Sequence, residues 1–74
     1  MIQFYDDEST KVAEIEFKAT NMPFVIDFLK RKSQNEVKYV VVFGKRILHA
    51  RFVLNEFEKC RGDYERTFAS VAKK

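Results

Sequence analysis

The sequence predicts an α+β fold of the order ββαββα, with a four-stranded, mainly antiparallel sheet and two helices packed on one of its faces. Apolar and polar residues alternate over two stretches, which is typical of half-buried strands. Over two other stretches, apolar residues recur every three or four positions, as on the buried side of a helix. The 74 residues suffice for one domain, 1–74, and 46% of them are hydrophobic, which is too many for a disordered chain.

The first half of the sequence predicts a hairpin followed by a helix. Its strands are Met1–Tyr5 and Thr10–Lys18, and the polar segment 6–9 joins them. Asn21 is expected to cap the helix, and a proline follows in the first turn, where its missing N–H removes no hydrogen bond. We expect the helix to continue to about Lys32 because apolar residues keep helical spacing up to that point.

The second half predicts another hairpin and another helix. Val37–Phe43 is rich in β-branched residues, and Gly44-Lys45 fits a two-residue turn with glycine in its first central position. The next strand is expected to extend from Arg46 to about Leu54. Asn55 would then cap a long amphipathic helix by a variant of the capping box. Gly62 lies within this helix, and a break there is left open.

A two-residue turn would fix which residues of the second hairpin share a face. The core face would hold Val37, Tyr39, Val41, Leu48, Ala50 and Phe52. On the opposite face, Lys38 would lie across from Arg51, and like charges in that position are destabilising unless an anion lies there. The candidate partner-binding residues are therefore those of the second face and the hairpin tip: Lys38, Val40, Val42, Lys45, Ile47, His49 and Arg51.

Three interpretations of this half-apolar, basic face remain open at the level of sequence. A helix covers its apolar end while the two cations extend into water. Alternatively, the face binds another protein or a second copy of the chain. In the third interpretation it binds nucleic acid, because phosphate contacts require Lys and Arg near apolar or aromatic surface.

The positive charge of the chain belongs to its second half. The net charge is +3, with five basic and seven acidic residues in 1–36 against nine basic and four acidic residues in 37–74. Lys30-Arg31-Lys32 and Lys73-Lys74 are expected at helix ends, where cations complement the helix dipole. A DNA-binding helix-turn-helix over Ala50–Cys60 and Tyr64–Ala72 fits poorly, because acidic residues stand where that motif needs a small and an apolar one.

The sequence offers no pattern typical of catalysis, metal binding or cofactor binding. Cys60 and His49 are the only soft or borderline metal ligands, whereas a structural zinc site needs four. Asp6-Asp7-Glu8 are consecutive and do not converge as calcium ligands must. With two glycines there is no glycine-rich phosphate loop. We therefore expect no enzyme, no cofactor and no small-molecule substrate.

These observations favour a small non-enzymatic protein-binding module, regulatory or inhibitory, that binds a protein partner or forms a homodimer. The alternative is a nucleic-acid-binding domain that uses the basic second half. A single cysteine indicates a reducing compartment, so a cytoplasmic protein is expected. No apolar run is long enough to cross a bilayer and the first residues do not resemble a signal peptide, so no membrane partner is expected.

Overall fold

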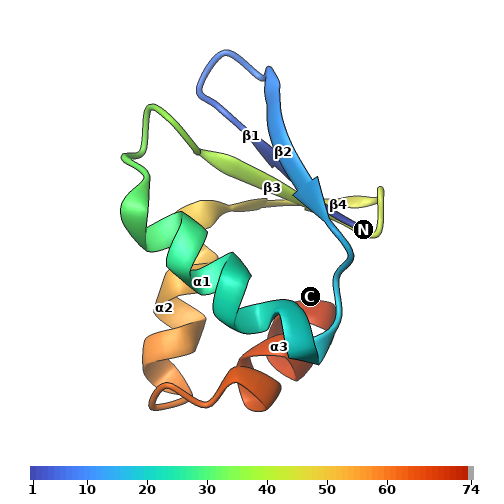
Figure 1. Cartoon of the computed structure of the whole chain (residues 1–74), viewed down its shortest axis with the longest axis vertical. Coiled ribbons are helices and arrows are strands. Elements are labelled where there is room, and N and C mark those ends of the chain that lie inside the picture. Colours follow the sequence, from blue (N-terminus) through green and yellow to red (C-terminus); the bar gives the residue numbers. More distant parts are fainter. Residues whose placement is uncertain (74) are drawn as a thin grey trace.

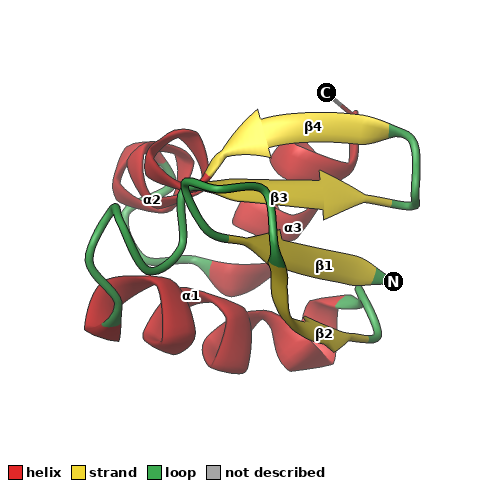
Figure 2. Cartoon of the chain, turned by 90° about the horizontal axis from the view of Figure 1, so that it is seen from above, coloured by secondary structure: helices red, strands yellow, loops and turns green. Residues whose placement is uncertain are grey.

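The computed structural model describes residues 1–73 and contains one antiparallel sheet with its helices on one side (Figure 1). The strands are β1 (Ile2–Tyr5), β2 (Lys11–Ile15), β3 (Tyr39–Val42) and β4 (Arg46–His49). The helices are α1 (Met22–Arg31), α2 (Ala50–Lys59) and α3 (Tyr64–Lys73), and a 3₁₀ turn, η1 (Ala19–Asn21), precedes α1. The strand order is β2-β1-β3-β4 (Figure 2), which confirms the predicted α+β class.

The first hairpin forms, but β2 covers only Lys11–Ile15 and ends three residues before the predicted Lys18. Ile2 and Phe4 of β1 point into the core and are buried, because β1 lies in the middle of the sheet between β2 and β3. The acidic loop closes on itself through Asp6, whose Oδ1 accepts hydrogen bonds from the backbone N–H groups of Glu8 and Thr10, both at 2.9 Å. This local use of the carboxylate is typical of a turn.

Helix α1 has the expected bounds, but Asn21 does not cap it through its side chain. The Nδ2 group of Asn21 instead donates a hydrogen bond to the carbonyl oxygen of Glu16 at 2.8 Å. The 3₁₀ turn η1 places Asn21 itself in a helical conformation, and a side-chain cap normally requires an extended one. Asn21 therefore fixes the connection from β2 to α1.

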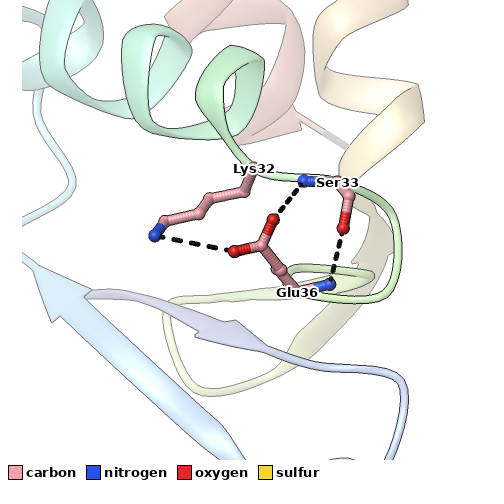
Figure 3. A network of polar contacts seen from close by, with 3 residues as sticks. All are labelled: Lys32, Ser33 and Glu36. Atoms are coloured by element: carbon pink, nitrogen blue, oxygen red, sulfur yellow. Dashed lines mark hydrogen bonds and ion pairs between the residues drawn. The ribbon is translucent and has the colours of Figure 1, made fainter.

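A capping box, which the sequence predicted at Asn55–Glu58, occurs instead in the turn after α1 (Figure 3). The backbone N–H of Ser33 donates to Oε1 of Glu36 at 3.0 Å, and the N–H of Glu36 donates to Oγ of Ser33 at 3.3 Å. The Nζ of Lys32 lies 3.9 Å from Oε2 of Glu36. These contacts hold the single turn that leads from α1 into β3.

The predicted register of the second hairpin is wrong by one residue. Val42 pairs with Arg46, which leaves three residues in the connection instead of two. The turn contains Phe43 and Gly44, both at positive φ (57° and 67°), and is closed by a 3.1 Å bond from the N–H of Lys45 to the carbonyl of Val42. A one-residue shift exchanges the faces of a strand, so Val40 and Val42 lie in the core.

The registers of the neighbouring strands explain this outcome. On β1, Phe4 lies opposite Val40 and Ile2 lies opposite Val42, so the buried residues of the two central strands match. Tyr39 therefore faces away from the helices, where its hydroxyl can reach water. The aromatic ring of Phe43 packs edge-on against that of Phe17, with centroids 5.4 Å apart.

The predicted strand from Arg46 to about Leu54 is also wrong in its second half. It ends at His49, and Ala50 begins α2, so Asn55 lies inside a helix and caps nothing. Val53 is fully buried, as helical spacing from Ala50 requires. The helix then ends before Gly62, so the break that the sequence left open does occur.

Helix α3 begins at a cap that the sequence analysis did not identify. Oδ1 of Asp63 accepts a 3.0 Å hydrogen bond from the N–H of Arg66. The bounds of α2 and α3 therefore agree within one residue with the two helices of the helix-turn-helix alternative, Ala50–Cys60 and Tyr64–Ala72. At the other end of α3, Nη2 of Arg46 donates to the carbonyl oxygen of Ala72 at 2.8 Å and ties the start of β4 to the helix.

Candidate functional site

The side of the sheet that faces away from the helices is the candidate site. It is called the outer face here, and its aromatic and aliphatic residues are Tyr5, Tyr39, Val41, Ile47 and His49. Gln3, which pairs with Val41, and Glu14, which pairs with Gln3, share this side of the sheet. Because side chains alternate along a strand, these residues point away from the core that Phe4, Val40 and Val42 form. No helix of residues 1–73 lies over this side of the sheet (Figures 1 and 2).

Cross-strand pairing brings the aromatic residues of the outer face together. Tyr5 of β1 lies opposite Tyr39 of β3, and Tyr39 in turn lies opposite His49 of β4. The rings of Tyr39 and His49 have centroids 5.1 Å apart. The Nζ of Lys38 lies 5.6 Å from the centroid of Tyr39, within cation–π range. Tyr39 is therefore the centre of an aromatic cluster with one cation beside it.

One aliphatic residue of the outer face, Ile47, is more exposed than its tyrosines, which are half-buried. Ile47 is 70% exposed, the highest value among the large hydrophobic residues that the structure exposes. Val41 pairs with it across β3 and β4. These two residues, together with Tyr5, Ser9 and Tyr39, line a shallow hollow of about 490 Å³. The outer face thus combines a concave apolar centre with polar groups at its edge.

The seven candidate residues from the sequence do not share one surface. Ile47 and His49 lie on the outer face, with Lys38 at its edge and Lys45 exposed at the hairpin tip. Val40 and Val42 are buried on the opposite side, so their assignment to the face is corrected. Arg51 is in α2 and does not lie opposite Lys38, whose carbonyl oxygen accepts a hydrogen bond from Ala50 at 2.9 Å.

Sequence reasoning missed Tyr5, Tyr39 and Val41 as members of this face. Tyr39 and Val41 were expected in the core because of the register error. Tyr5 alternates with Phe4 in a strand whose inward residues were predicted correctly, so its outward direction followed from the sequence pattern.

The expected lack of catalytic and metal chemistry remains a prediction. Within residues 1–73, no three His, Cys, Asp or Glu side chains gather closely enough to hold a metal ion. Cys60 is the C-terminal cap of α2, whereas His49 precedes the first residue of the same helix. The length of that helix places the two residues about 16 Å apart. They therefore do not form a nucleophile–base pair.

None of the described helices has the length and apolar character needed to cross a membrane.

Comparisons of the chain with protein-family models, with curated proteins and with solved structures found no match.

Proposed function

We propose that the protein is a small, non-enzymatic protein-binding module that self-associates through the outer face of its sheet. The observation that supports this most strongly is the 70% exposure of Ile47 beside Val41 and two tyrosines. Clustered exposed apolar residues with a polar edge are characteristic of protein interfaces. Tyrosine is also enriched among the residues that contribute most to binding between proteins.

The small size of the chain favours a second copy of itself as the partner. A chain of 74 residues builds a small core, so a dimer is a direct way to bury more apolar surface. A specific dimer needs roughly 600 Å² from each protomer at the lower limit. The whole protein exposes 4814 Å² and measures 30 × 22 × 18 Å, so one side of it is large enough to supply that area.

The proposal is tested by the change Ile47→Glu. A carboxylate at the centre of a dimer interface would be desolvated without a partner, so the variant should be monomeric at concentrations where the parent protein is dimeric. Sedimentation equilibrium at protein concentrations from about 10 µM to about 1 mM measures this, since weak dimers have dissociation constants in or below that range.

Phe24→Glu is the matched control. Phe24 is 67% exposed, almost as much as Ile47, but it belongs to α1 and therefore lies on the helical side of the protein. The control should dimerise like the parent protein, and circular dichroism should show that both variants are folded. A parent protein that remains monomeric at about 1 mM would contradict the proposal, and so would an equal loss of dimer in both variants.

A regulatory or inhibitory role in the cytoplasm is part of the same proposal. The single free cysteine, Cys60, supports a reducing compartment, and the exposed apolar cluster of the outer face supports a role exerted through association. Nucleic-acid binding, the second function expected from the sequence, is supported at a different place in the molecule.

A further inference from the structure

A groove between α1 and α2 gathers three cationic side chains from three segments of the chain. Lys30 comes from the last turn of α1, Arg51 from the first turn of α2, and Arg61 from the connection to α3. They line a hollow of about 500 Å³, in which Glu58 is the only acidic residue. A second hollow of about 230 Å³ shares Lys30 and Arg51 with the first and adds Lys32. The groove therefore extends past four cations.

The three cations of the main hollow have no carboxylate partner within residues 1–73. The four ion pairs of this part of the chain use Lys11, Lys18, Arg31 and Lys32. The Nζ of Lys30 lies instead 5.0 Å from the centroid of the Phe57 ring, which holds the ammonium group at the groove. A groove in which positive charges outnumber negative ones three to one attracts anionic ligands.

The backbone at Arg61 is a second, independent observation. The N–H of Gly62 bonds to the carbonyl of Phe57 at 3.0 Å, and the N–H of Arg61 bonds to that of Glu58 at 2.9 Å. These two bonds define a Schellman motif, in which the position of Arg61 is normally glycine because the backbone is left-handed. Arg61 has a φ of 56°. An arginine here is strained, and its side chain faces the cationic groove.

We propose that this groove binds the phosphodiester backbone of a single-stranded nucleic acid. Arginine suits phosphate because its planar group donates two parallel hydrogen bonds. Several cations along one groove match a chain of phosphates better than they match a single small anion. A flexible single strand can bend into a hollow of about 500 Å³, so we expect single strands to bind more tightly than duplexes. The proposal concerns a surface distinct from the outer face, and it does not depend on self-association.

The test measures the fluorescence anisotropy of a labelled 12-nucleotide oligothymidylate as protein is added. The logarithm of the affinity for single strands changes with the logarithm of salt concentration by about −0.7 per phosphate neutralised. The parent protein should therefore show a slope of about −2 to −3. In Arg51→Gln/Arg61→Gln the slope should be smaller in magnitude by about 1.4, and the affinity at ~50 mM salt about 50-fold lower.

The matched control is Lys18→Gln/Lys45→Gln, which also removes two positive charges. Lys18 lies between β2 and η1 and Lys45 lies in the β3–β4 turn, at the end of the molecule away from the last turn of α1 (Figure 1). This variant should keep most of the affinity of the parent protein. Circular dichroism verifies that both double variants are folded.

The single change Arg61→Gly separates binding from stability. Glycine adopts a left-handed backbone without strain, so the variant should unfold at a temperature a few degrees above that of the parent protein. Its affinity for the oligonucleotide should nevertheless fall, because one cation is missing. Loss of affinity together with loss of stability would instead assign Arg61 a structural role and contradict the proposal.

Three further outcomes would overturn it. The first is no change in anisotropy at about 50 mM salt, where phosphate contacts are strong. The second is an equal loss of affinity in the control variant, which would indicate attraction by net charge alone. The third is displacement of the oligonucleotide by polyglutamate at equal charge concentration, which would assign the groove to an acidic protein.

Discussion

The structure lowers the pKa of Glu36, which lies in the turn between α1 and β3. The backbone N–H of Ser33 donates to its carboxylate, and this hydrogen bond, with help from the Ser33 side chain and the nearby Lys32 ammonium, lowers the pKa of Glu36 from its ordinary value of 4.5. A lowered pKa in the folded state means that the unfolded chain binds more protons in acid. The contribution of Glu36 to stability is therefore present above the unfolded pKa and is lost as the pH falls through the folded one.

Two measurements examine this prediction. An NMR titration of the side-chain carboxyl carbon should give Glu36 a pKa below that of the same residue in an unfolded peptide of residues 30–37. The variant Glu36→Gln should lose less stability than the parent protein when the pH is lowered below about 4.5, because its side chain does not titrate. If the Glu36 carboxyl titrates at its ordinary value, the capping box of Figure 3 does not form in solution.

At the scale of elements, the register of the second hairpin decides which residues are core and which are exposed. Val40 is fully buried between Phe4 and Leu48, whereas Val41 lies on the outer face beside Ile47. Val40→Ala should therefore reduce the free energy of unfolding by about 2 kcal/mol, through lost burial and the cavity that remains.

Val41→Ala is the matched variant on the same strand. It should change the free energy of unfolding by less than about 0.5–1 kcal/mol, because its side chain is only half-buried. Urea denaturation of the two variants measures the difference. A larger loss of stability in Val41→Ala than in Val40→Ala would contradict the observed register. It would favour the register with a two-residue turn.

The sequence predicted the first hairpin and α1 well because each pattern there allowed one interpretation. Ile2 and Phe4 alternate with polar or half-exposed residues, and α1 starts beside a proline. In the second half, two sequence patterns, one in the second hairpin and one at the start of α2, were each compatible with two structures. Val40-Val41-Val42 keeps the same hydrophobicity when the register moves by one residue, so only the neighbouring strand β1 distinguishes the faces.

The start of α2 was ambiguous for a similar reason. Leu48, Ala50, Phe52 and Leu54 alternate as in a strand, while Ala50, Val53, Leu54 and Phe57 have helical spacing. The cationic groove was beyond prediction, because Lys30 and Arg51 come together only when α1 packs against α2. Of the candidate site, the sequence therefore identified Ile47 and His49 but not the tyrosines that surround them.

At the scale of the whole molecule, the two proposed binding surfaces lie on different layers. The outer face belongs to the sheet, and the cationic groove lies between helices on the other side of it (Figure 1). Binding at one surface therefore leaves the other open. A dimer formed through the outer face would present two grooves, and two linked sites bind a long strand more tightly than one.

The proposal that the outer face is the self-association surface is tested most directly by NMR at increasing dilution. Amide ¹H–¹⁵N spectra recorded from about 1 mM to about 10 µM protein cover the range expected for a weak dimer. We predict concentration-dependent shifts at Tyr5, Tyr39, Val41, Ile47 and His49, and none at the exposed residues of α1. Spectra that do not change on dilution, or changes confined to the helices, would contradict the proposal.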